Sequence, residues 1–144
     1  MSAGTGVTHS EMNHYAEQVT EFLQIWIIPD EQGMAPSYEQ MALNPKVLDG
    51  RPLPVLASPR GERGGIGLHQ DASMLGGEVK AGVSVRYTLK EGRLGYFHMP
   101  KGAMRVGGVD VNEGDGLYLA GPETLEFTAA VSYTHLRAHE TETN

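Results

Sequence analysis

The stretch Val83-Ser84-Val85-Arg86-Tyr87-Thr88-Leu89 decides the fold of this chain. Its apolar side chains alternate with polar or charged ones. Because successive side chains of a strand point to opposite faces, the alternation places one apolar face on a core and one polar face in water. The stretch therefore predicts a half-buried strand of an antiparallel sheet.

Further short segments of the same kind surround this stretch along the chain. Turn signals such as Glu91-Gly92, Lys101-Gly102 and Gly107-Gly108 separate them. The expected strands are Val55–Ala57, Ile66–His69, Ser73–Val79, Leu94–Met99, Ala103–Val106, Gly116–Leu119 and Leu125–Ala129. Strands at this spacing predict an all-β sandwich or jelly roll.

The amino-terminal part, residues 1–43, predicts fewer strands. Phe22-Leu23-Gln24-Ile25-Trp26-Ile27-Ile28 is rich in β-branched and aromatic residues and ends at Pro29, which predicts a strand buried on nearly both faces. Residues 14–20 predict a polar loop. Two or three strands are too few for a closed barrel or sandwich. We expect residues 1–43 to lie partly on the sandwich formed by the rest of the chain. Phe22 and Trp26 should make most of the contact, because aromatic side chains bury large areas.

Composition and charge exclude several classes of function. The 144 residues carry a formal net charge of −7 and no basic stripe, which argues against a nucleic-acid partner. The longest apolar run, residues 22–28, is too short to span a bilayer, and no signal-peptide pattern is present. The absence of cysteine excludes disulfides and cysteine chemistry. We expect a folded cytoplasmic protein with neither a nucleic-acid nor a membrane partner.

The candidate functional residues are His9 and Glu11, which follow the turn signal Gly4-Thr5-Gly6. Two residues apart on an extended segment, they project from the same face. An imidazole and a carboxylate form half of a mixed site that suits iron, manganese, nickel, copper or zinc. The two glycines can adopt positive φ angles, so the chain can turn sharply before His9. The competing interpretation is a chance pair of polar residues, since an isolated H-x-E motif is common.

Other polar groups give weaker signals. His69 and Asp71 would share a strand face, but a histidine at a strand end beside a turn explains them equally well. His98 lies between apolar neighbours and is interpreted as a packed or rim residue. The triplet Gly114-Asp115-Gly116 precedes an expected strand and not a helix, so it indicates a β-turn and not a phosphate-binding loop.

Two parts of the chain resemble a known family. The run from Gly4 through His9 to Asn13 resembles the second cupin motif, with Gly4 in place of its proline, and together with Phe22–Pro29 and Pro36–Tyr38 it is similar to the pirin family and its bacterial quercetinase-like members. Residues 44–130 resemble the second cupin of the same proteins through Leu56-Ala57-Ser58-Pro59, Leu68-His69-Gln70-Asp71-Ala72 and the turn at residues 113–116.

The resemblance implies a cupin jelly roll and a function. Family members bind one divalent metal, commonly iron, through three histidines and one glutamate, and some cleave flavonols such as quercetin with dioxygen. His9 and Glu11 would be two metal ligands, and Glu11 would also move a proton as a catalytic residue. The second cupin is a metal-free scaffold in this family. The sequence does not give the oligomeric state, and we expect a monomer for the whole protein. The alternative is a non-enzymatic metal-binding module that serves regulation or protein interaction.

The two ends of the sequence carry expectations of their own. In the family the other two ligands come from an upstream H-x-H motif, and no histidine precedes His9 here. We therefore expect residues 1–43 to be the last strands of a first cupin, and the chain alone to be inactive. Residues 131–144 resemble the translation of an adapter used to prepare sequencing libraries. On this interpretation they are left out of the predicted fold.

Overall fold

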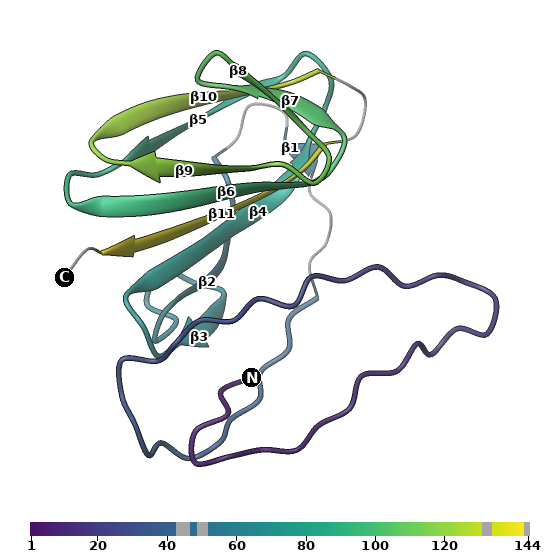
Figure 1. Cartoon of the computed structure of the whole chain (residues 1–144), viewed down its shortest axis with the longest axis vertical. Helices are drawn as coiled ribbons and strands as arrows, with labels where there is room; N and C mark the ends of the chain where they lie inside the picture. The colour runs from purple at the N-terminus through teal and green to yellow at the C-terminus, as the bar shows by residue number, and fades with distance from the viewer. Residues whose placement is uncertain (43–46, 49–51, 131–133, 143–144) are drawn as a thin grey trace.

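The computed structural model describes residues 1–42, 47–48, 52–130 and 134–142 of the chain. Within these residues the regular elements are strands, and they form two sheets that pack face to face (Figure 1). The all-β class predicted from the sequence is confirmed. The predicted boundary between residues 43 and 44, and the turn residues Pro45 and Gly50, lie outside the described residues.

The larger sheet contains seven of the described strands. Their order in space is β3-β2-β4-β11-β6-β9, and β1 pairs with β4 beside this path. The pairs β1–β4 and β2–β3 are parallel, and the others are antiparallel. The strands are β1 Val47–Leu48, β2 Val55–Pro59, β3 Ile66–Leu68, β4 Ala72–Val79, β6 Arg93–Lys101, β9 Gly116–Ala120 and β11 Thr134–Glu142.

The smaller sheet contains four of the described strands, in the order β5-β10-β7-β8. All three pairs are antiparallel. The strands are β5 Ser84–Leu89, β7 Ala103–Val106, β8 Val109–Asn112 and β10 Glu123–Ala129. Because β6 of the larger sheet leads directly into β7 of the smaller one, the chain crosses between the layers there, as a jelly roll requires.

The core lies between the sheets. Phe97 of β6 and Phe127 of β10 have no exposed surface, and their ring centroids lie 5.4 Å apart. Burial of such a side chain contributes about 1.5–3 kcal/mol. Further buried side chains pack around the two rings, namely Leu53, Leu75, Val79, Val85, Met99, Met104, Val106, Val111, Leu125 and Ala129.

The strand predicted from residues 83–89 is confirmed as β5. Val85 and Leu89 are buried and Tyr87 is half-buried, whereas Arg86 and Thr88 are exposed. The other segments predicted between residues 55 and 129 correspond to β2, β3, β4, β6, β7, β9 and β10. Strand β8 was not predicted from the sequence. The predicted β-turn is also confirmed, since the Asp115 N–H donates to the Asn112 carbonyl at 3.0 Å.

Strand β11 lies where no strand was expected. Its backbone pairs with β4 on one side and with β6 on the other, in the middle of the larger sheet (Figure 1). Residues 131–144 were left out of the predicted fold; residues 134–142 pair within the larger sheet, and residues 131–133 and 143–144 lie outside the described part. The adapter origin of this segment stays a prediction.

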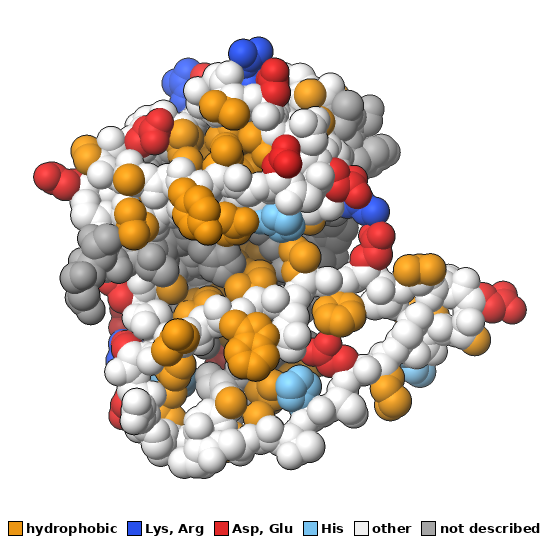
Figure 2. Space-filling model, in the orientation of Figure 1, with side chains coloured by type: hydrophobic (Ala, Val, Ile, Leu, Met, Phe, Trp, Pro, Cys, Tyr) orange, Lys and Arg blue, Asp and Glu red, His pale blue; other side chains and the backbone are white. Residues whose placement is uncertain are grey.

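Residues 1–42, which we call the arm, form a long loop below the sandwich (Figure 1). The strand predicted for residues 22–28 is wrong, because these residues are extended without forming a strand. The predicted contact is wrong as well, since Trp26 is 87% exposed and Phe22 is 67% exposed. Apolar side chains of the arm lie open at the surface in Figure 2.

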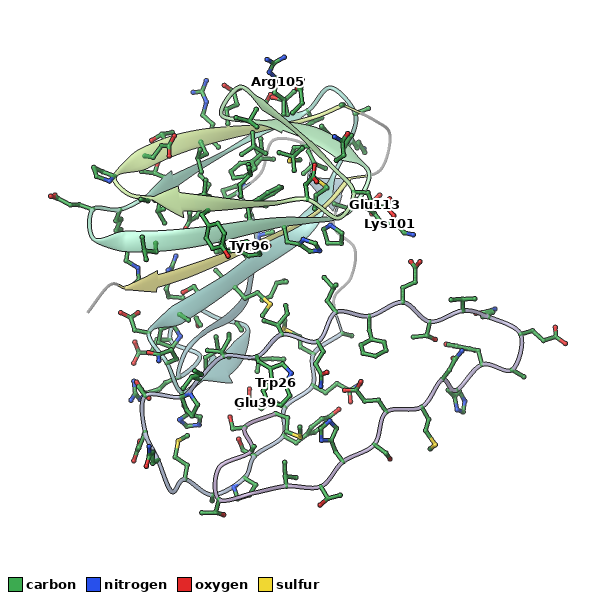
Figure 3. The ribbon with its side chains drawn as sticks, viewed as in Figure 1. Trp26, Glu39, Tyr96, Lys101, Arg105 and Glu113 are labelled. Atoms are coloured by element: carbon green, nitrogen blue, oxygen red, sulfur yellow. The ribbon has the colours of Figure 1, made fainter. Side chains whose placement is uncertain are left out.

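Hydrogen bonds and ion pairs attach the arm to the sandwich. The Asp30 N–H donates to the carbonyl of His69 at 2.8 Å, and Lys101 Nζ donates to Glu21 Oε1 at 3.0 Å. The Glu39 carboxylate accepts from the Gly67 N–H at 3.0 Å. Figure 3 labels Lys101 at one end of the sandwich and Glu39 in the arm. Among the described residues, no helix is long and apolar enough to cross a membrane.

Candidate metal half-site

The candidate site begins at the turn Gly4-Thr5-Gly6. Gly4 has a φ of 52° and Gly6 a φ of 130°, so both glycines adopt the positive angles expected from the sequence. The Thr5 N–H donates to the Met34 carbonyl at 2.9 Å. Ser2 and Ser37 form a β-bridge beside it. These contacts hold the turn against Met34 and Ser37, in the later part of the arm.

Gly4 is required at this turn for a second reason. A Cβ atom placed on Gly4 would clash with the Met34 carbonyl oxygen. That oxygen is the acceptor for Thr5, so a side chain at position 4 would displace the hydrogen bond that fixes the turn. The sequence signal for this close approach is the glycine itself.

The structure brings His9 and Glu11 side by side. His9 Nε2 lies 3.8 Å from Glu11 Oε1, and the two side chains are 41% and 54% exposed. The predicted adjacency is thus present, although residues 7–14 are not a β-strand. Their role as metal ligands stays a prediction.

The donor set fits part of a divalent metal site. Two ligands at about 2.0–2.1 Å from a tetrahedral ion lie about 3.3–3.4 Å from each other, close to the observed separation. Both side chains are exposed and can close this difference by small rotations. No group of three or more histidine, aspartate or glutamate side chains suited to a metal occurs among the described residues. The described chain therefore offers half of a site.

Asn13 organises the segment that follows the half-site. Its Oδ1 accepts hydrogen bonds from the Tyr15 N–H at 3.0 Å and the Thr20 hydroxyl at 2.7 Å, and its Nδ2 donates to the Gln18 carbonyl at 2.6 Å. Asparagine suits this position because its side chain can both donate and accept. From the sequence Asn13 was visible only as the last residue of the motif.

The weaker candidates do not join the half-site. Asp71 accepts a hydrogen bond from Arg93 at 2.8 Å, which explains its position structurally. His98 Nδ1 lies 3.1 Å from the Asp115 carbonyl, in keeping with a rim residue beside the turn. On the larger sheet, the exposed rings of Tyr96 and Tyr118 lie 5.1 Å apart. This aromatic pair was not singled out from the sequence.

Part of the chain matches a known protein family. The family of the quercetinase C-terminal cupin domain matches residues 55–136, which span β2 to the first residues of β11. This range is more than half of the chain. It covers most of the sandwich and not the half-site on the arm.

Two relatives match more of the chain. A Zymomonas mobilis protein provisionally named a quercetin 2,3-dioxygenase is 35% identical over 129 residues, 90% of this chain and 54% of that protein. The Escherichia coli protein named quercetin 2,3-dioxygenase is 32% identical over 130 residues, 90% of this chain and 54% of that protein. The chain thus spans about half the length of these relatives.

Solved structures show the same fold. The crystal structure of YhhW from Escherichia coli matches with a TM-score of 0.72 and 22% identity, over 83% of this chain and 49% of that one. The bacterial pirin YhhW in complex with nickel(II) matches with a TM-score of 0.70 and 21% identity, over the same shares of both chains.

Proposed function

We propose that this chain, which belongs to the quercetinase C-terminal cupin domain family of pirin-like proteins, serves in a metal-dependent dioxygenase of the cytoplasm. The substrate would be a small aromatic molecule of the flavonol class, cleaved with dioxygen. The names of the relatives support this substrate class. The observation that carries the proposal is the pairing of His9 Nε2 and Glu11 Oε1 at 3.8 Å on an exposed part of the arm.

His9 and Glu11 would hold a divalent ion together with ligands that the described residues do not supply. We propose iron(II) as the ion, and nickel is the leading alternative because a crystal structure of the related fold contains it. When bound, such an ion supplies Lewis-acid chemistry to an aromatic hydroxyl. The imidazole of His9 would contribute a neutral nitrogen ligand, and its orientation would depend on a hydrogen-bond partner at its other ring nitrogen.

Glu11 would have a second role beside ligation. Its carboxylate is 54% exposed and is therefore accessible to a substrate. A carboxylate within hydrogen-bonding reach of a flavonol hydroxyl can accept its proton, which makes the oxygen a better electron donor. We therefore propose Glu11 as the general base, with the sandwich acting as the scaffold that supports the arm through Gly67, His69 and Lys101.

A chimera tests this proposal. Residues 1–130 would replace the aligned half of the Escherichia coli quercetin 2,3-dioxygenase, and the iron-loaded chimera would be given quercetin in an oxygen electrode. We expect oxygen uptake that falls by about 100-fold or more on Glu11→Gln and is abolished by His9→Ala. His14→Ala is the matched control, since His14 is another exposed histidine of the arm. Equal uptake with and without His9 would contradict the proposal.

A second candidate is a metal-binding module without enzymatic activity. The exposed apolar side chains of the arm favour it, because Trp26, Val19 and Ile28 are each more than 80% exposed. Such groups are typical of surfaces that bind a protein partner. A chimera that binds iron through His9 but consumes no oxygen with any flavonol would favour this candidate.

A further inference from the structure

We infer that Glu39 is a positioning residue, which transmits the support of the sandwich to the turn that carries His9 and Glu11. This inference rests on the ligand roles given to His9 and Glu11 in the proposed function. It deepens that proposal by naming the side chain on which the placement of the pair depends. Glu39 would act through the backbone of the arm and not on the reacting atoms.

Glu39 binds the edge strand of the larger sheet. Among the described residues, β3 stands at one end of the strand order (Figure 1), and an edge strand presents N–H groups that no neighbouring strand accepts. The Gly67 N–H of β3 donates to Glu39 Oε2 at 3.0 Å, across 28 residues of sequence. A carboxylate acceptor makes this hydrogen bond stronger than one between neutral groups. Glu39 therefore attaches the later part of the arm to the sheet.

The residues just before Glu39 bind the beginning of the chain. The Ser37 N–H donates to the Ser2 carbonyl at 3.0 Å, and the Ser2 N–H donates to the Ser37 carbonyl at 2.8 Å. Ser37 lies only two residues before Glu39. A displacement of Glu39 from β3 would therefore reach this bridge through a very short stretch of backbone.

A second hydrogen bond continues the series of contacts to the metal pair. The Thr5 N–H donates to the Met34 carbonyl at 2.9 Å, and Thr5 lies four residues before His9. His9 and Glu11 are 41% and 54% exposed, so core packing does not fix their side chains. Their placement depends on the backbone that carries them. Support of this backbone reduces the conformational freedom that is lost when an ion binds.

The other links between the arm and the sandwich are less suited to this role. The exposed ion pair of Lys101 with Glu21 joins a more distant part of the arm, and exposed ion pairs contribute little stability. Asp30 binds the sandwich through its main-chain N–H, which donates to the His69 carbonyl. Of these three links, that of Glu39 lies nearest in sequence to the bridge between residues 2 and 37.

Amide hydrogen exchange of the 144-residue chain, measured by NMR, tests the positioning role without metal. In Glu39→Ala we expect the N–H groups of Gly67, Ser37 and Thr5 to exchange at least about 10-fold faster, while those of β6 in the sandwich keep their rates. Glu39→Gln should restore most of the protection, because its side-chain oxygen can accept the same hydrogen bond. The matched control is Glu31→Ala, at another exposed glutamate of the arm, and it should change none of these rates.

A titration with zinc(II) alone tests the consequence for the metal pair. The same chain would be titrated while NMR follows the imidazole signals of His9. We expect Glu39→Ala to weaken zinc affinity by up to about 10-fold, the lower end of the range typical for loss of support around a metal site. The affinities of Glu39→Gln and Glu31→Ala should stay near that of the unchanged chain.

The outcomes separate this inference from the proposed function. Faster exchange in Glu39→Ala at Gly67 alone, with Ser37 and Thr5 unchanged, would overturn the positioning role, because Glu39 would then only cap the edge of the sheet. Unchanged zinc affinity at His9 would also overturn it. If zinc left the His9 signals of the unchanged chain unaltered, the ligand roles would be overturned, and the exchange rates would still decide the role of Glu39.

Discussion

The arm and the sandwich contain similar apolar residues but use them differently. In the sandwich, Phe97 and Phe127 are fully buried between two sheets. In the arm, Phe22 and Trp26 are mostly exposed, and hydrogen bonds and ion pairs hold the segment in place. The comparison teaches that apolar content alone does not produce a core. A second layer must face the apolar side chains.

This difference predicts that a protease cuts the arm long before the sandwich. Local opening of exposed segments costs little free energy, whereas opening of a core requires nearly the full free energy of unfolding. We expect chymotrypsin, which cuts after aromatic and large apolar residues such as Tyr15, Phe22 and Trp26, to cleave within residues 13–28 at least about 100-fold faster than within residues 52–130. Mass spectrometry should find a stable core that begins near residue 44. An arm as protected as the core would contradict the comparison.

Core truncation gives the next largest effect. Phe97→Ala removes a fully buried ring that contacts Phe127, and we expect it to lower the free energy of unfolding by about 3–5 kcal/mol. Phe22→Ala is the matched control in the arm, where a change within about 0.5 kcal/mol is expected. Urea denaturation of both variants measures the difference. Similar losses for the two variants would show that the arm has a core of its own.

Replacement of Gly4 should affect the arm and leave the sandwich unchanged. Gly4→Ala forces a Cβ against the Met34 carbonyl at a positive φ, so the turn must shift, at a local cost of about 1–3 kcal/mol. Gly33→Ala is the matched control, because its φ is 75° but a Cβ there meets no atom within 4 Å. We expect zinc affinity to weaken more in Gly4→Ala than in Gly33→Ala. Unfolding of the sandwich should be the same in both.

The smallest effect concerns the ion pair between Lys101 and Glu21. The hydrogen bond and charge of Glu21, with the charge of Glu113, raise the pKa of Lys101 above its ordinary value of 10.5. The attraction between Lys101 and Glu21 is therefore fully present below pH 10.5, and it is lost as the pH rises through the raised pKa of Lys101. We expect cleavage of the arm to quicken slightly above about pH 10.5, and Glu21→Gln to remove this pH dependence. The sandwich alone should show no such change.

The sequence predicted the sandwich well because alternation of side chains is a local signal. The alternation within residues 83–89 defines one apolar face, and this alone is enough to predict a strand with one face buried. The same reasoning failed for residues 22–28, since strand propensity does not reveal whether a pairing partner exists. The strand at residues 134–142 was missed for the opposite reason. Neighbouring strands on both sides supply its hydrogen bonds, and its own sequence gives little sign of them.

The candidate site was predictable only in part. The spacing of His9 and Glu11 predicted their adjacency, and the glycines predicted the turn before them. The contact of Gly4 with Met34 joins residues far apart in the sequence, and no local pattern encodes it. The three hydrogen bonds of Asn13 were hidden for a similar reason, because an asparagine in a polar loop has many equivalent explanations.

The central place of β11 has a consequence for how the larger sheet can be assembled. From Thr134 opposite Val79 to Thr141 opposite Ala72, β11 pairs with β4 through its main chain, and β6 pairs with its other edge. Main-chain pairing of this kind accepts many side chains, as donor-strand complementation between separate polypeptides demonstrates. Within the described part of the chain, β4 and β6 are therefore joined in the larger sheet through the main chain of β11.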